Sequence, residues 1–429
     1  MTKESKTIFS TLKINKTLFE NISSLTLLKF FEYALPLLTI PYLVRTLGIG
    51  NFGVYSFATA FMSYFVVITN YGFDLTATRD ISINRSNKEY IQKVVSTVYT
   101  IKILLAFICF LLLLVLITFV PKFNHEFNAY LITFILVIGN VLFPVWFFQG
   151  IENMKYITFL NITAKLIVTL SIFILVNDRN DYVLALFINS FSYLLPGIMA
   201  IFILYFKYKI KWTSVNKNDI LKMINEGWNI FVSTFLGNIV ASSGTFILGL
   251  TSSNSAVGIY SSIEKIVRAV IGLFTPITQA LFPYISAKFA QGYNLGLTIV
   301  KKAGKVIMLT AVLIGILIIL LSQFILKILY GAKVAEYSLV MQILVVWLII
   351  SVLNNIIGYQ YLIASEQEKK YTNSFLLAGS ITIFLYLVLS VPFSMYGIIF
   401  AMLIGELSLT IFMLFSIRRD KLLLSKRGS

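Results

Sequence analysis

Runs of roughly 20 apolar residues recur along the whole of this 429-residue chain. A run of about this length crosses a hydrocarbon core of ~30 Å as an α-helix. Helices satisfy their backbone hydrogen bonds internally, which lipid demands of any spanning segment. The sequence therefore predicts an all-α integral membrane protein with twelve spans. Their expected bounds are Ile22–Val44, Phe52–Tyr71, Val94–Val120, Tyr130–Gln149, Tyr156–Val176, Tyr182–Phe206, Trp228–Leu250, Val257–Pro283, Val306–Leu329, Tyr337–Ile363, Tyr371–Val391 and Met395–Ile417.

The composition excludes a soluble globular protein. Apolar residues make up 58% of the chain and charged residues 12%, whereas soluble domains average about 25% charged. The chain has one cysteine, Cys109, and one histidine, His125. These numbers exclude a disulfide framework and an ordinary Cys/His metal site, and we expect no metal and no other cofactor.

The net charge of +17 would indicate a nucleic-acid partner in a soluble protein. Here the charges follow the membrane topology instead. At the ends of the expected spans and between them, 25 lysines and arginines fall on the side of the termini and five on the other. Cytoplasmic loops are enriched in these residues, so we predict that both termini are cytoplasmic and that no nucleic acid is bound.

The second half of the sequence repeats features of the first. Gly53-Val-Tyr-Ser56 recurs as Gly258-Ile-Tyr-Ser261, and the segment 149–156 has an echo in 364–371. Such repeats are typical of duplicated transporters. We therefore predict two six-helix bundles joined by a polar linker. The expected segments are an N-terminal cytoplasmic segment 1–21, bundles 22–206 and 227–417, the linker 207–226 and a basic cytoplasmic tail 418–429.

The opening hairpin favours a transporter over a passive anchor. Its first span carries Pro36 and Pro41, which predict a broken helix. Proline is tolerated within a bilayer where neighbouring helices or cavity water satisfy the freed carbonyls. A short Gly-rich turn, residues 46–53, then leads directly into the second span.

Four spans carry distinctive motifs. They are Pro41-Tyr-Leu43 with Arg45 and Leu47-Gly48, Phe52-Gly-x-Tyr55, Tyr71-Gly72 with Arg79, Pro144–Met154, Ala256–Lys265 and Leu281–Ser286. These motifs resemble the Wzx-type oligosaccharide flippases, a family of the MATE-like superfamily that includes multidrug extruders and the lipid II flippase. The resemblance covers most of the chain, although some relatives have fourteen spans.

The resemblance implies a function in O-antigen or capsule synthesis. The cargo would be an oligosaccharide on undecaprenyl pyrophosphate, moved by alternating access across the bacterial inner membrane. The chain would then be no enzyme. Its partners would be the lipid-linked cargo, membrane lipids, polysaccharide polymerase or chain-length machinery, and a coupling ion, H⁺ or Na⁺.

Charged residues within the spans are candidate site residues, because each costs ~2.5–3.5 kcal/mol at the bilayer centre without a partner or a wet cavity. Arg268 lies one turn after Glu264 in the eighth span. The functional interpretation is an arginine free to bind an anion; the alternative is an intrahelical ion pair. Lys265 points to another side of the helix. For Lys102 and Lys165, a side chain that reaches the nearer interface is at least as good an explanation.

Further candidates are Glu32 and Lys29 in the first span, Arg45 and Arg79 near the ends of the opening hairpin, and Asn229 and Asn238 in the seventh span. Arginine suits phosphate because it binds in a bidentate manner, but Arg79 also has Asp74 and Asp80 as possible ion-pair partners. The seventh span combines both asparagines with hydroxyls and small residues. This polar face favours a water-lined wall for sugars over simple close packing.

Two rival functions remain open. A multidrug or cation antiporter of the same superfamily would need acidic residues to dominate the cleft, and here basic residues are at least as numerous. A polysaccharide polymerase or ligase would need a long outer loop, and all the expected outer loops are short.

Overall fold

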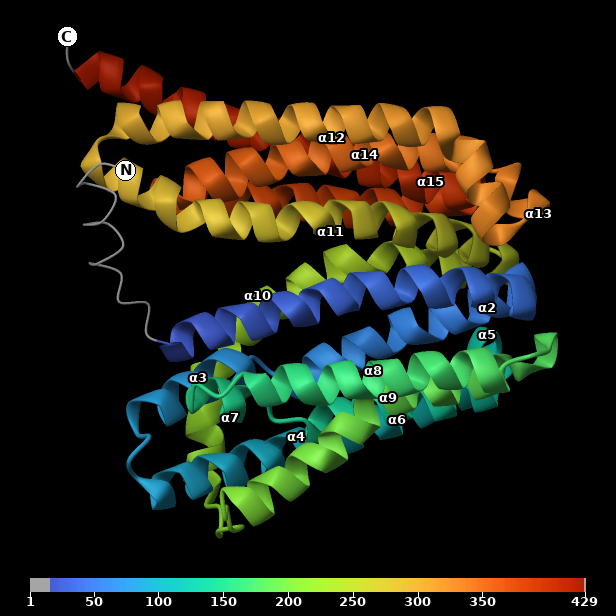
Figure 1. Ribbon diagram of the computed structural model, residues 1–429, viewed down its shortest axis with the longest axis vertical. Helices are drawn as coiled ribbons and strands as arrows, with labels where there is room; N and C mark the ends of the chain where they lie inside the picture. The colour runs from blue at the N-terminus through green and yellow to red at the C-terminus, as the bar shows by residue number, and fades with distance from the viewer. Residues whose placement is uncertain (1–15, 428–429) are drawn as a thin grey trace. The chain divides into compact units, whose positions relative to one another are not determined.

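The computed structural model describes residues 16–427, which form α-helices, 3₁₀- and π-helical turns and loops without a strand (Figure 1). The expectations for residues 1–15 lie outside this range. The first half contains α2 Lys16–Asn70, α3 Phe73–Ile83, α4 Lys88–Phe119, α5 Pro121–Asn124, α6 Phe127–Leu142, α7 Val145–Gly150, α8 Lys155–Leu175, η1 Arg179–Asp181, α9 Tyr182–Phe202 and η2 Ile203–Lys207. The second half contains α10 Lys217–Thr251, α11 Asn254–Gln291, α12 Tyr293–Tyr330, α13 Ala332–Ala335, α14 Ser338–Asn355, η3 Ile356–Ile363 and α15 Glu368–Arg427.

Ten helical segments in the described chain are long and apolar enough to cross a membrane. Two of them contain two helices each, because α2 is interrupted at Gly48 (φ 77°) and α15 at Ser394 (φ 50°). This arrangement is consistent with twelve spans. The break predicted at Pro36 and Pro41 was wrong, since Gly48 is the non-helical residue within α2. Glycine enters the left-handed region at no steric cost.

The chain forms two compact units. The first takes in the chain up to Pro36, then Phe61–Val176 and Val183–Asn238. The second takes in Leu37–Ala60, Asn177–Tyr182 and the chain from Ile239 onward. The sequence-based boundaries at residues 206 and 227 stay a prediction.

A core of aliphatic and aromatic side chains lies within the first unit, where α3, α4 and α7 meet. Phe73, Trp146, Phe147 and Phe148 are all at most 1% exposed. Gly150 allows this close approach, because a Cβ at that position would lie 2.7 Å from Ile81 of α3. In the second unit, α11, α12 and α14 lie side by side (Figure 1).

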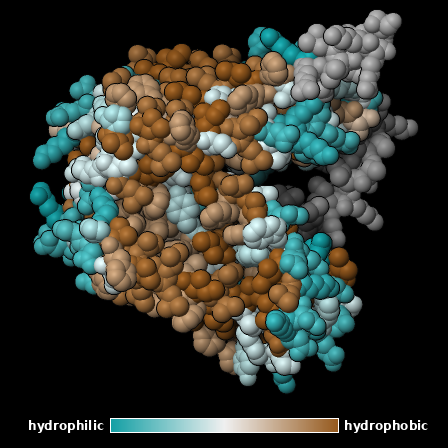
Figure 2. Space-filling model, turned by 180° about the vertical axis from the view of Figure 1, so that it is seen from behind, coloured by the Kyte–Doolittle hydropathy of each residue, from teal (hydrophilic) through white to brown (hydrophobic). Residues whose placement is uncertain are grey.

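Apolar side chains also cover much of the outside. Figure 2 shows hydrophobic residues over most of the face seen, with hydrophilic residues toward its edges. The exposed large apolar side chains include Phe107 and Leu111 of α4 and Leu313 and Leu320 of α12. In water this surface would be costly, so we assign it to contact with lipid tails.

The repeated turn motif has the same backbone structure in both copies. Glu152 and Glu366 adopt left-handed φ values of 56° and 61°. In the first copy the backbone N–H of Asn153 donates to the Phe148 carbonyl at 2.8 Å. In the second copy the backbone N–H of Gln367 donates to the Leu362 carbonyl at 2.8 Å. The two repeated segments in the sequence, 149–156 and 364–371, therefore form the same type of turn.

Candidate functional site

A cluster of two lysines and one glutamate lies within the first unit. On α2, Lys29 Nζ is 2.7 Å from Glu32 Oε2, a contact across one helical turn. On α8, Lys165 Nζ is 3.4 Å from Glu32 Oε1. The side chains are 56%, 32% and 24% exposed for Lys29, Glu32 and Lys165, respectively. The cluster therefore carries one excess positive charge at an accessible position inside membrane spans.

Lys165 was not among the predicted site residues. One explanation of Lys165 from the sequence was a side chain that extends to the nearer membrane interface. The structure differs, because the Lys165 ammonium pairs with Glu32. The partners are 133 residues apart in the sequence, so no local pattern could have revealed the pair. Two ammonium groups around one carboxylate leave donors and charge for a further anion.

Lys102 is fully enclosed, with 1% of its surface exposed. Its ammonium donates to Asn70 Oδ1 at 3.0 Å and to the Asn140 carbonyl at 3.1 Å. These contacts join α2, α4 and α6 within the first unit. Lys102 therefore neither reaches an interface nor faces a ligand, and its contacts hold the three helices together.

Glu264 and Arg268 form an ion pair along α11 in the second unit. Arg268 Nη2 lies 2.7 Å and Nε 2.8 Å from Glu264 Oε1. The Tyr260 hydroxyl donates to the same oxygen at 3.2 Å, and Arg268 Nη2 also donates to the Ala241 carbonyl at 3.1 Å. Arg268 is 40% exposed, whereas Glu264 is 9% exposed. The pair thus takes the intrahelical form that was the alternative to an arginine without a partner, and the Arg268 side chain stays partly exposed.

Lys265 faces a different set of groups, as its position on the helix predicts. Its ammonium lies 5.7 Å and 5.8 Å from the ring centroids of Phe52 and Tyr55, both on α2. Such cation–π contacts stabilise a lysine inside an apolar region. Lys265 is therefore separated from the face that carries Arg268.

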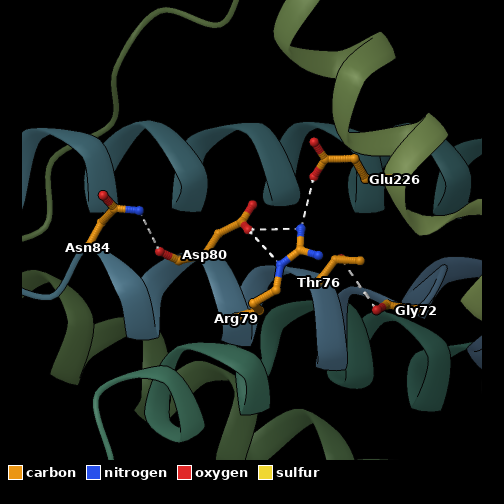
Figure 3. A network of polar contacts seen from close by, with 6 residues as sticks. All are labelled: Gly72, Thr76, Arg79, Asp80, Asn84 and Glu226. Carbon is orange, nitrogen blue, oxygen red and sulfur yellow. Dashed lines mark hydrogen bonds and ion pairs between the residues drawn. The ribbon is translucent and has the colours of Figure 1, made fainter.

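The two arginines of the opening hairpin are engaged by protein groups. Arg45 donates from Nε to the Leu329 carbonyl at 2.9 Å and from Nη2 to the Ile328 carbonyl. It thereby caps the last turn of α12. Arg79 lies between Asp80 and Glu226, with an Nη2–carboxylate distance of 3.3 Å to each (Figure 3). The predicted partner Asp80 is confirmed, and Glu226 of α10 was missed.

The polar face of α10 is accessible at Asn229. The neighbouring Ser233 and Thr234 donate to backbone carbonyls of their own helix, at 2.9 Å each for the i−4 contacts. Farther along, Asn238 is half-buried and its Oδ1 is enclosed without a donor among the described residues. Asn229 therefore has an exposed side-chain amide. Asn238 has a side-chain oxygen that accepts no hydrogen bond from the described residues.

Sequence reasoning missed the surroundings of Glu406. Asn354 of α14 donates from Nδ2 to Glu406 Oε2 at 2.5 Å, and the Thr410 hydroxyl donates to Asn354 Oδ1 at 2.6 Å. The sequence shows an acid within a span but not its partner, which lies 52 residues away. Across residues 16–427 no cluster of three or more His, Cys, Asp or Glu could hold a metal ion.

Comparisons with known proteins give concordant results. A family model described as "Polysaccharide biosynthesis protein" matches residues 18–289. A protein of Escherichia coli (strain K12) named "Putative O-antigen transporter" is 31% identical over 409 residues, covering 95% of this chain and 98% of the relative. A Shigella dysenteriae protein of the same name is 27% identical over 405 residues, covering 93% and 100%.

Two solved structures have a similar fold. The inward closed conformation of the lipid II flippase MurJ has a TM-score of 0.72 at 15% identity and covers 92% of this chain and 87% of its own. An inward-facing multidrug resistance MATE family transporter of the MOP superfamily has a TM-score of 0.61 at 15% identity and covers 91% and 99%.

Proposed function

The chain belongs to the polysaccharide biosynthesis protein family, and we propose that it is a flippase for a lipid-linked oligosaccharide. The cargo would be an O-antigen or capsule repeat unit on undecaprenyl pyrophosphate, transferred from the inner to the outer leaflet of the bacterial inner membrane. The two related O-antigen transporters support the cargo class, and the MurJ-like fold is compatible with it.

The Lys29–Glu32–Lys165 cluster is the observation that carries this proposal. It keeps an excess positive charge and exposed ammonium groups within membrane spans. A lasting positive charge at that depth is costly unless an anion or water joins it. A pyrophosphate supplies such an anion, and its prenyl chain can remain in the surrounding lipid.

The glycan needs hydrogen-bonding groups in place of water. Asn229 of α10 is exposed and can both donate and accept. Apolar drugs would gain little from such a residue, whereas sugar hydroxyls match it. The two duplicated bundles would expose the cargo alternately to each side, with both termini in the cytoplasm and a polymerase receiving the product outside.

The rival functions receive less support. A cation antiporter would place excess negative charge at its accessible site, yet the cluster in the first unit is positive. A polymerase or ligase receives less support, because the two relatives that match over nearly the whole chain are named as O-antigen transporters.

The experiment reconstitutes the wild-type protein in liposomes with an undecaprenyl-pyrophosphate oligosaccharide and measures its exposure to an external lectin. We expect transfer in the wild type and at least tenfold slower transfer in Lys165→Gln. Lys155→Gln is the matched control, because Lys155 is an exposed lysine on the same helix outside the cluster. If the protein instead carries cationic dyes and leaves the glycolipid in place, the antiporter interpretation is correct.

A further inference from the structure

Glu406, a half-buried residue, is hydrogen-bonded to the buried Asn354 inside the second unit. Asn354, 5% exposed, donates from Nδ2 to both Glu406 Oε2 at 2.5 Å and the Glu406 carbonyl at 2.9 Å. Thr410, 9% exposed, fixes the orientation of that amide by donating to Asn354 Oδ1. The carboxyl is therefore held in one place by neutral groups only.

No lysine, arginine or histidine nitrogen of the described residues lies within 4.0 Å of this carboxyl. From α11, Arg268 acts on it through space, while its contact ion pair is with Glu264 at 2.7 Å. From the first helix of α15, Tyr371 also interacts with it electrostatically, and α14 contributes neutral groups. Arg268 thus makes its contact ion pair with Glu264 and acts on Glu406 only at longer range, so Glu406 has no contact ion-pair partner among the described residues.

An unpaired carboxylate inside a membrane protein is neutralised by a proton or by a bound cation. A metal cation needs several converging oxygen ligands. Here the amide presents its NH₂ group to the carboxyl, and the amide oxygen is already occupied by Thr410. These contacts favour a proton over a sodium ion.

We propose that Glu406 binds and releases a proton during the transport cycle. This inference rests on the proposed function and identifies the coupling ion and its site.

The surroundings also accommodate the ionised state. The indole Nε1 of Trp347, a residue 5% exposed, is buried without an acceptor in hydrogen-bonding geometry. The Trp347 indole and the Ser351 hydroxyl nevertheless lie close enough to interact with the Glu406 carboxyl. Both groups are donors from which the ionised carboxylate can accept. The site therefore has neutral partners for the ionised state.

Trp347 also connects Glu406 to the partly exposed arginine. The guanidinium carbon of Arg268 lies 5.3 Å from the centroid of the Trp347 ring. Ionised Glu406 offsets the positive charge of Arg268, and protonation removes that offset. A proton on Glu406 and an anion at Arg268 consequently favour each other, and this coupling is reciprocal.

Infrared difference spectroscopy tests the proton site without a ligand. Spectra of the purified protein in lipid nanodiscs are compared between about pH 6 and about pH 8, a range in which ordinary exposed carboxyls do not titrate. We expect a protonated-carboxyl band in the wild type, its loss in Glu406→Gln and its shift in Glu406→Asp. Glu368→Gln, a change at an exposed acid at the start of α15, should keep the band. Absence of the band from the wild type, or its persistence in Glu406→Gln, overturns the proposal.

Binding of geranylgeranyl pyrophosphate tests the coupling. We expect the affinity of the wild type to rise about fivefold or more from pH 8 to pH 6 beyond the change seen in Glu406→Gln. Equal pH dependence in the two proteins overturns the coupling. If the wild type binds no prenyl pyrophosphate at either pH, the proposed cargo fails, and the infrared result alone decides whether Glu406 carries a proton. Glu406→Asp serves both measurements if Glu406→Gln does not accumulate.

Discussion

Gly53 and Gly258 pack at one helix crossing in a reciprocal manner. A Cβ on Gly53 would lie 1.8 Å from the Asn254 carbonyl oxygen, and a Cβ on Gly258 would lie 2.0 Å from the Ile49 carbonyl oxygen. Each glycine begins one copy of the repeated motif, and Ile49 and Asn254 each precede their glycine by four residues. The contact therefore maps onto itself when the two copies are exchanged, as a local two-fold axis requires.

This crossing predicts that alanine is not tolerated at either glycine. Gly53→Ala and Gly258→Ala each place a methyl group inside the backbone of the facing helix, and overpacking costs about 1–3 kcal/mol or more. We expect a lower midpoint of thermal unfolding in detergent for both variants. Gly237→Ala is the control, because its Cβ meets nothing within 4 Å and alanine favours the helix. Unchanged unfolding of Gly53→Ala would show that the helices are not in close contact.

The turn at Glu152 predicts a small pH dependence of stability. Arg85 lies 2.7 Å from the Glu152 carboxylate, and its hydrogen bond lowers the pKa of that group from the ordinary 4.5. A lowered pKa in the folded state contributes stability that is present above the unfolded pKa and lost as the pH falls through the folded one. Both side chains are more than a third exposed, so the contribution is within about 1 kcal/mol.

Chemical unfolding at about pH 7 and about pH 3 measures this contribution. We expect Glu152→Gln to lower stability at the higher pH and to match the wild type at the lower one. Glu366→Gln is the matched control, because Glu366 has the same left-handed backbone but no ion-pair partner among the described residues. An equal effect of the two substitutions at pH 7 would show that Arg85 contributes nothing.

The charge asymmetry predicts the topology. In a Cys109→Ala background, Asn218→Cys should react with an impermeant thiol reagent from the cytoplasmic side, and His125→Cys from the outside. Both positions are exposed, and the His125 side chain is 86% exposed, so access does not limit labelling. Reaction of both cysteines from one side would contradict the twelve-span arrangement.

The sequence predicted those features that depend on local pattern. Apolar run length located the spans, and the repeated Glu152 and Glu366 segments identified one turn formed twice. The turn predicted at residues 46–53 is confirmed by the left-handed Gly48, whereas the break expected at Pro36 and Pro41 is absent, because both prolines are accommodated within α2.

The site was less predictable, since its contacts join helices far apart in the chain. Lys165 contacts Glu32, which is 133 residues away in the sequence, and Asn354 contacts Glu406, which is 52 residues away. Spacing along one helix revealed the Glu264–Arg268 pair because its members are four residues apart. The substrate roles assigned to these residues stay predictions.

Arg268 provides the last prediction, because its ion pair and its partial exposure point to different roles. Arg268→Ala leaves Glu264 buried without its cation, and removing one partner of a buried pair costs up to about 3–5 kcal/mol. We therefore expect Arg268→Ala to lower the stability and to abolish transport. This variant alone does not distinguish neutralisation of Glu264 from binding of the anion. Arg268→Lys keeps the charge but loses the bidentate geometry, so it should retain part of the activity.

The double substitution Glu264→Gln with Arg268→Gln separates them. It leaves no unmatched charge and keeps polar side chains of similar size, so unfolding should return toward the wild-type midpoint. If Arg268 binds the pyrophosphate, the double variant should accumulate, insert and yet move the glycolipid at least tenfold more slowly in the lectin assay. Transport at the wild-type rate would instead mean that Arg268 serves only to neutralise Glu264, and the anion site would then rest on Lys29 and Lys165 alone.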